Sequence, residues 1–117
     1  MTQEELLNTI NNNSNDIEFD DVIDTINRYY SYTPTRFVNG IGNDIVINEA
    51  GVNEGSCKIF AYARIVGLTK QQTLACFAQY YRDVLSDPGG DNHANIRCFN
   101  RHGWKGIHFD SDALKQH

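Results

Sequence analysis

Residues 48–60 of the chain read NEAGVNEGSCKIF. Up to Lys58 this stretch is too polar to lie in a hydrophobic core, and from Ile59 onward apolar residues recur at helical spacing. The stretch therefore predicts a polar loop that runs into a helix over about 56–66, with Gly67 as the residue that ends it. The rest of the fold is predicted by working outward from this loop in both directions.

The segment before the loop, residues 37–48, lacks helical periodicity. It contains two turn signals, NG at 39–40 and GN at 42–43, and Ile45 and Ile47 would lie on one face of a strand. We expect a β-hairpin or a looser ribbon here.

Two helices are predicted upstream of this ribbon. Thr2 and Glu5 match a capping box at the start of a helix over about 3–12. A second helix begins near Phe19, where apolar residues recur at helical spacing, and ends before Thr33-Pro34, since a proline disfavours helix in the residue before it.

Downstream of the loop, the pattern predicts two more helices. Thr69 and Gln72 match a capping box, and apolar spacing then continues to Leu85, so we expect one uninterrupted helix there. The turn sequence DPGG at 87–90 separates it from a fifth helix over about 92–102, with Asp91 as its cap. Residues 104–109 are a candidate strand that joins the ribbon, and residues 111–117 are expected to fray.

Five helices and one or two short β segments predict a helix-dominated α+β fold, with an all-α bundle as the alternative. We expect residues 1–117 to form a single domain. Hydrophobic residues make up 40% of the chain and charged residues 21%, and the mean hydropathy is −0.50. These values are typical of soluble globular proteins and exclude collagen-like, disordered and disulfide-scaffold classes.

The same figures limit partners and location. The most apolar stretch, residues 59–68, is far shorter than the roughly 20 residues that a membrane helix needs, and no secretory signal precedes the first helix. A net charge of −5 argues against binding to nucleic acid. Three cysteines without C-x-x-C spacing predict free thiols in a reducing cytoplasm.

The first candidate site is Gly55-Ser56-Cys57-Lys58. If a helix begins at Ser56, its free N–H groups form an anion site to which Lys58 adds positive charge, and the same position would lower the pKa of Cys57 toward a nucleophilic thiolate. The simpler interpretation is a helix cap, with Ser56 satisfying backbone donors and Cys57 buried as a small apolar side chain.

His93 is the second candidate. In the first turn of a helix its imidazole would stay neutral and could act as a base or a ligand. Cys57, His93 and Asn95 are the residue types of a Cys-His-Asn triad, but side chains two positions apart on one helix diverge. The catalytic residues are therefore unknown, with Cys57 and His93 as candidates, and we favour a protein that is not an enzyme.

Two further groups of residues are candidates for a phosphate site and for a metal site. Arg97 and Arg101 lie four residues apart, with Lys105 beyond, and could hold a phosphate or an acidic partner; a solvated face, or pairing with acids of the second helix, is the alternative. No recognised ligand spacing appears, so we expect neither metal nor cofactor. The potential ligands considered were His93, His102, His108, Glu49, Glu54 and Asp91.

Several segments together resemble the HopJ type III effector family. They are FVNG at 37–40, NEAGVNEGSCKIF at 48–60, QTLACF at 72–77, YYRDVL at 80–85, HANIR at 93–97 and GWKGI at 103–107. The resemblance covers the chain from about Leu6 to Phe109 and implies a bacterial protein that a type III secretion system injects into plant cells. It carries over no catalytic residue.

Two classes of function remain open: a small binding domain centred on residues 48–58, or an enzyme that uses Cys57 or His93. For the binding domain we expect a small anionic ligand or a protein partner, with phosphate held at the N–H groups of Ser56 and Cys57 on a concave surface near His93. A role in the bacterial cytoplasm is expected at least as much as injection. The predicted binding residues are Asn48, Asn53, Glu54, Ser56, Lys58, His93 and Arg97.

Overall fold

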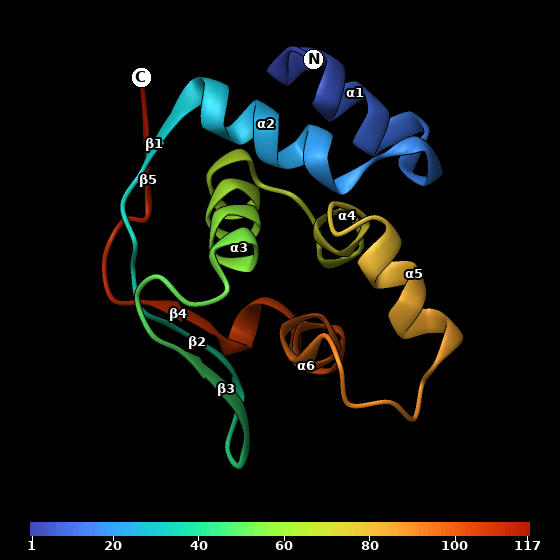
Figure 1. The fold of residues 1–117 in the computed structure, drawn as a ribbon, viewed down its shortest axis with the longest axis vertical. Helices are drawn as coiled ribbons and strands as arrows, with labels where there is room; N and C mark the ends of the chain where they lie inside the picture. The colour runs from blue at the N-terminus through green and yellow to red at the C-terminus, as the bar shows by residue number, and fades with distance from the viewer.

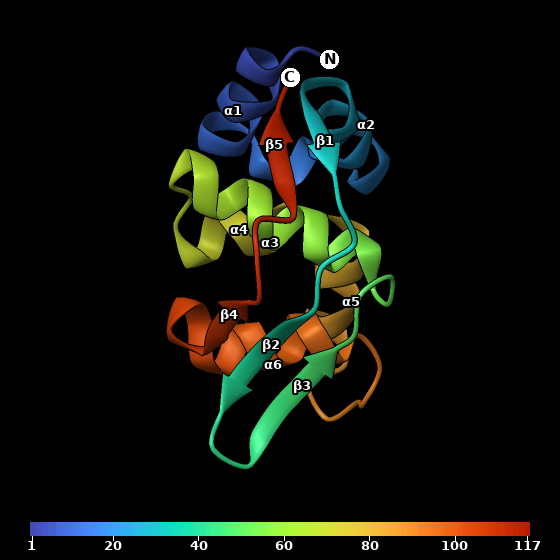
Figure 2. The same ribbon diagram turned by 90° about the vertical axis from the view of Figure 1, so that its left-hand side faces the viewer.

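A computed structural model describes residues 1–117, and its helices and strands form three layers (Figures 1 and 2). Helices α1 and α2 form one outer layer, α3 and α4 lie in the middle, and α6 with the larger sheet forms the other outer layer. The elements are α1 Gln3–Asn12, η1 Ser14–Asp16, α2 Phe19–Tyr29, β1 Tyr30–Tyr32, β2 Phe37–Ile41, β3 Asp44–Asn48, α3 Glu54–Val66, α4 Lys70–Ala75, α5 Gln79–Ser86, α6 Ala94–His102, η2 Gly103–Gly106, β4 Ile107–Phe109 and β5 Leu114–Gln116.

The fold is α+β and dominated by helices, as predicted, and the all-α alternative is wrong. Strands β3, β2 and β4 form an antiparallel sheet in that order, and β1 pairs with β5. The predicted hairpin is β2–β3, in which Phe37 faces Asn48 and Ile41 faces Asp44. Within the segment 104–109, only Ile107–Phe109 is a strand, and it pairs with β2 as expected.

The C-terminal segment corrects two predictions. Residues 111–117 do not fray, because Leu114–Gln116 forms β5 and Ala113 and Leu114 are buried. The strand that receives them is Tyr30–Tyr32, so the second helix ends at Tyr29 rather than continuing toward Thr33. Aromatic residues favour strands when a partner strand is present, and here the partner lies more than 80 positions away in the sequence.

The helix predicted from Thr69 to Leu85 is two helices. Ala78 has φ 52° and ψ −120°, a conformation that a right-handed helix cannot contain, and the chain changes direction there between α4 and α5 (Figure 1). The side chain of Phe77 enters the core at this break. The periodic pattern continues across the break, which is why the sequence did not reveal it.

Phe60 lies at the centre of the hydrophobic core. Its ring centroid is 4.9 Å from that of Phe99, 5.4 Å from Phe77, 5.9 Å from Phe37 and 6.4 Å from Trp104. The apolar spacing of the sequence predicts that five residues, Phe60 included, are largely buried, and all five are. They are Phe60, Leu74, Phe77, Ile96 and Phe99.

Two glycines bring the sheet and the segment after α6 into backbone contact. A Cβ on Gly106 would lie 2.7 Å from the backbone nitrogen of Gly40, and a Cβ on Gly40 would lie 2.7 Å from the sulfur of Cys98. Gly40 also has φ 123°, which L side chains rarely adopt. Both positions therefore require glycine for β2, β4 and α6 to come together.

None of the helices has both the length and the apolar character needed to cross a bilayer.

Candidate functional site

A buried network of asparagines joins the end of β3 to the start of α6. Asn48 and Asn95 exchange amide hydrogen bonds: Nδ2 of Asn48 donates to Oδ1 of Asn95 (3.0 Å), and Nδ2 of Asn95 donates to Oδ1 of Asn48 (2.8 Å). Asn39 on β2 donates to Asn95, and Asn53 donates to Asn48 (2.7 Å). Asn48 is thus buried in the scaffold, and it fixes the loop before α3 next to the first turn of α6.

Helices α3 and α6 both begin after a residue in the left-handed conformation. Asn53 has φ 55° and ψ 50°, and His93 has φ 53° and ψ 49°. An N-cap side chain normally accepts bonds from the N–H groups that follow it, but it does so from an extended backbone. Neither Asn53 nor His93 caps its helix. Left-handed backbone at such residues costs roughly 1–2 kcal/mol each.

The first N–H groups of these two helices consequently lack partners in the protein. The first backbone bonds run from Cys57 to the carbonyl of Asn53 (3.0 Å) and from Arg97 to that of His93 (3.1 Å). The N–H groups of residues 54–56 and 94–96 precede those bonds and have no acceptor. The prediction that the Cys57 N–H binds an anion is therefore wrong, and the helix begins at Glu54, earlier than expected.

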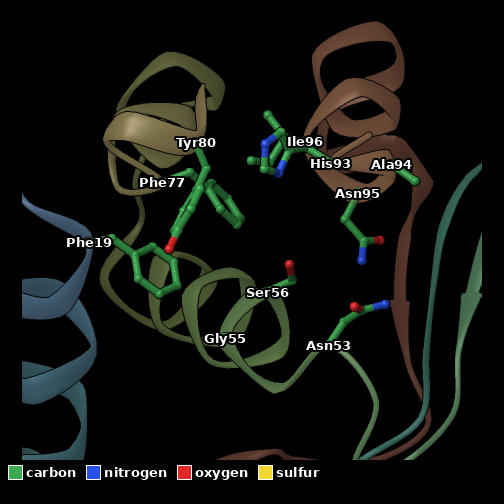
Figure 3. Close-up of a pocket in the computed structure, with 10 residues that line it drawn as sticks. All are labelled: Phe19, Asn53, Gly55, Ser56, Phe77, Tyr80, His93, Ala94, Asn95 and Ile96. Carbon is green, nitrogen blue, oxygen red and sulfur yellow. The ribbon is translucent and has the colours of Figure 1, made fainter. Parts of the chain in front are cut away.

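A hollow of about 390 Å³ lies between these two helix starts, the start of α5 and the start of α2 (Figure 3). The hydroxyl of Ser56 points into it, with aromatic side chains on one side and the amides of Asn53 and Asn95 on the other (Figure 3). We call this hollow the inter-helix pocket. Its lining residues are Phe19, Asn53, Gly55, Ser56, Phe77, Tyr80, His93, Ala94, Asn95 and Ile96.

The aromatic wall of the pocket depends on a glycine. The Phe19 and Tyr80 rings meet edge to face at 5.0 Å between centroids, and the His93 ring lies 5.5 Å from that of Tyr80. A Cβ on Gly55 would lie 2.9 Å from Cζ of Phe19, so glycine lets the ring rest on the start of α3. The sequence did not reveal Phe19 and Tyr80 as pocket residues, because they come from separate helices.

His93 is the residue immediately before α6 and does not lie in the first turn of that helix. Its Nε2 lies 3.5 Å from Oδ2 of Asp83 on α5, and a quarter of the side chain is exposed. The imidazole therefore closes the pocket on the α5 side. It lies on the same concave surface as Asn53 and Ser56 of the polar loop.

Glu54 and Lys58 lie on a different side of α3. Nζ of Lys58 donates to Oδ1 of Asn27 (3.0 Å) and lies 4.8 Å above the ring of Tyr32. Glu54 also neighbours Tyr32, and burial together with this carboxylate raises the pKa of the Tyr32 hydroxyl. Neither side chain lines the inter-helix pocket.

Cys57 faces the core. Its sulfur lies 3.7 Å from the carbonyl oxygen of Thr35, and burial raises the pKa of the thiol. The predicted lowering of this pKa is wrong, because α3 begins at Glu54 and places Cys57 past the exposed first N–H groups. The Cys-His-Asn triad is not formed either, since Asn95 is held by Asn39 and Asn48. All three cysteines are free, as predicted.

The two arginines of α6 do not converge on one ligand. Arg97 is 7% exposed and donates to the backbone carbonyls of Asp87 (2.7 Å) and Asn92 (2.6 Å) and to Oδ1 of Asn92 (2.7 Å). These bonds hold the loop between α5 and α6, so Arg97 is not free to bind a ligand. Arg101 pairs with Asp44 at 2.7 Å, not with acids of the second helix.

One group of potential metal ligands comes together, at the hairpin tip. Atoms of Asp44, Cys98 and His102 lie within 4.8 Å of one another, and of these only His102 was among the residues considered from sequence. The Asp44 carboxylate already accepts bonds from Arg101 and from His102 (2.6 Å), which lower its pKa to about 2. Arg101 and His102 already occupy this ionised carboxylate, so the group is better suited to an ion-pair network than to binding a metal cation.

Both the sequence and the structure of the chain resemble known proteins. A family model described as HopJ type III effector protein matches residues 3–114. A solved structure titled "Crystal structure of unknown function protein VPA0580" is 41% identical, with a TM-score of 0.94, and the match covers 100% of this chain and 95% of that chain. Among curated proteins, none matches.

Proposed function

This chain belongs to the HopJ type III effector family, and we propose that its fold is a binding module for a small molecule that carries an anionic group. The ligand is held in the inter-helix pocket. One observation carries the proposal: two helix N-termini, both without side-chain caps, open onto a single hollow.

The physical basis is the field at a helix start. Unpaired N–H groups and the aligned peptide dipoles place about half a positive charge at each N-terminus. The starts of α3 and α6 both contribute to the pocket lining, through Gly55 and Ser56 and through Ala94 and Asn95. An anion in the pocket would therefore interact with two such fields and gain the hydroxyl of Ser56 as a further donor.

A second candidate is acid–base catalysis by His93. It is favoured by the carboxylate of Asp83, 3.5 Å from Nε2, which can hold an imidazole in one orientation. Hydrolysis of p-nitrophenyl acetate by wild type and His93→Gln tests it. We expect equal rates from the two proteins, and a rate that collapses in the variant would favour catalysis instead. Cys57 takes no part, because its thiol is buried.

The test of binding is an NMR titration with inorganic phosphate at low salt. We expect amide shifts concentrated on residues 54–56 and 94–96, while the capped starts of α1 and α4 serve as internal references. Lys58→Ala should change the apparent Kd by less than about twofold, because Lys58 points toward α2. Shifts spread over basic side chains, with residues 54–56 and 94–96 unmoved, would refute the pocket as an anion site.

We also propose that the protein works in the bacterial cytoplasm, with delivery into a host cell as the alternative that the family description suggests. Three free, buried cysteines support a reducing compartment. A translocation reporter fused to the full chain, compared in bacteria with and without an active type III system, tests this. Host-cell signal that depends on the secretion system would overturn the cytoplasmic proposal.

A further inference from the structure

The side of the inter-helix pocket opposite the amides of Asn53 and Asn95 is aromatic (Figure 3). Phe19 and Tyr80 meet edge to face on this side, and Phe77 also lines the hollow (Figure 3). Phe77 also belongs to the hydrophobic core, whereas Tyr80 is 36% exposed. Tyr80 is therefore an aromatic surface that a ligand can cover. Aromatic side chains favour flat partners in stacked or edge-on contact.

Asn95 contributes a buried donor on the polar side. The residue is 6% exposed overall, its Oδ1 accepts bonds from both Asn39 and Asn48, and its Nδ2 donates to Asn48. An amide nitrogen carries two N–H groups, so one has no acceptor in the protein. That nitrogen lies toward Ser56 and Asn53 (Figure 3). A buried donor without a partner is costly, and an acceptor on a ligand would satisfy it.

The charge of the pocket limits the charge of its ligand. No lysine or arginine lines it, since Lys58 is bound to Asn27 and Arg97 to the loop before α6. Asp83 adds a carboxylate beside His93. Sites for phosphate esters generally include arginine or lysine, whereas a carboxylate can be held by hydroxyl, amide and backbone N–H donors.

We infer that the ligand is a small aromatic monocarboxylate. Its ring lies against Tyr80 and Phe19, and its carboxylate accepts bonds from Ser56, from the spare N–H of Asn95 and from the first N–H groups of α3 and α6. The volume of about 390 Å³ is sufficient for one substituted ring. This inference rests on the proposed function, because it names the ligand class of the same pocket.

The experiment compares four probes by NMR titration of the full chain: benzoate, cyclohexanecarboxylate, acetate and benzyl alcohol. Benzoate should bind about tenfold more tightly than acetate. It should also bind more tightly than cyclohexanecarboxylate, which lacks the aromatic ring, and than benzyl alcohol, which lacks the carboxylate. The shifts should fall on Ser56, Asn95 and Tyr80. Ser56→Ala should weaken benzoate and acetate by the same factor, because the hydroxyl contacts the carboxylate in both.

Variants of Tyr80 test the ring contact. Tyr80→Ala should weaken benzoate about fivefold or more and leave acetate unchanged, and Tyr80→Phe should keep the affinity of wild type. The matched control is Tyr81→Ala, the adjacent tyrosine, which lines a separate groove next to α1. If circular dichroism shows that the alanine variant is unfolded, Tyr80→Leu replaces it.

The outcomes separate this inference from the proposed function. If acetate and phosphate move residues 54–56 and 94–96 but benzoate binds no more tightly than acetate, the pocket binds anions and the aromatic class is wrong. If cyclohexanecarboxylate equals benzoate, the wall is merely apolar and the class is also wrong. If no probe moves these amides, both the inference and the proposed function fail.

Discussion

Helices α1 and α4 begin with complete capping boxes, whereas α3 and α6 begin with none. At α4, Thr69 Oγ1 accepts from the Gln72 N–H (3.1 Å) and Gln72 Oε1 accepts from the Thr69 N–H (2.9 Å), and Thr2 and Glu5 form the same pair at α1. At α3 and α6 the residue before the helix is left-handed and its side chain turns elsewhere.

The difference follows the surroundings of each helix. The starts of α1 and α4 are exposed, and their own side chains satisfy the first N–H groups. The starts of α3 and α6 face the inter-helix pocket and keep those groups available. Ala78 before α5 also has positive φ, so all the non-glycine residues with this strained backbone precede helices around the pocket. Strain concentrated in one place is typical of binding sites.

The largest expected effect comes from Phe77, which belongs to both the core and the pocket wall. Phe77→Ala should lower the free energy of unfolding by about 3–5 kcal/mol, because the ring is 2% exposed and lies 5.4 Å from that of Phe60. Urea unfolding measures the change. The exposed Leu85→Ala on α5 is the control, and a loss for Phe77→Ala of under about 1 kcal/mol would show that the pocket lies outside the core.

The asparagine network gives the next largest effect, because it holds the two uncapped starts together. Asn48→Ala should cost about 2–3 kcal/mol of unfolding free energy, since it leaves the buried amide of Asn95 without its reciprocal partner. Asn43→Ala, at an exposed residue of the β2–β3 turn, should change stability by less than about 0.5 kcal/mol. Equal losses in the two variants would contradict the structural role of Asn48.

Substitutions at the capped start of α4 and at the uncapped start of α6 should change the free energy of unfolding in opposite directions. Thr69→Ala removes a cap and should lower the free energy of unfolding by about 1 kcal/mol. His93→Gly removes no cap and relieves left-handed strain, partly offset by the flexibility of glycine in the unfolded chain, so stability should rise by about 0.5 kcal/mol. Thermal unfolding of both variants decides the matter: if His93→Gly is destabilised as much as Thr69→Ala, residue 93 is not strained.

The smallest effect concerns the other end of α6, which Arg101 and His102 fasten to Asp44. Hydrogen bonds from these two residues lower the pKa of Asp44 to about 2 from its ordinary 3.8. A carboxyl with a lowered folded pKa contributes stability above pH 3.8 and loses that contribution as the pH falls toward 2. Wild type should therefore be slightly more stable than Asp44→Asn at pH 6 and lose this advantage near pH 2. A difference that stays constant across this range would mean that the ion pair contributes nothing.

Local chemistry predicted much of this fold. Both capping boxes, the hairpin and the glycine after α3 depend on residues within a few positions of one another, so Thr2, Thr69 and Gly67 could be interpreted from sequence. The pairing of β5 with β1 could not, because Leu114 has no local partner that marks it as a strand. The break at Ala78 was also hidden, since alanine normally favours helix and the apolar spacing continues across the break.

The candidate site was predicted in part for the same reason. Asn53, Ser56 and His93 do line one concave surface, as the density of polar residues suggested. The direction of Lys58 and the burial of Cys57 depend on where α3 begins, and the left-handed Asn53 shifts that point. The aromatic wall is formed by Phe19 and Tyr80, residues from two helices that only the assembled core brings together.

The backbone contact between Gly40 and Gly106 limits which positions can change during evolution. Neither glycine lines the pocket, so both are required by the architecture whatever the molecule binds. Among diverged relatives, we expect these two positions to change last, whereas Ser56 and Tyr80 would be free to change if the proposed binding function were lost. A homologue that keeps both glycines but has replaced Ser56 and Tyr80 would have kept the fold without the proposed binding site, so genome surveys can trace the fold and the site separately.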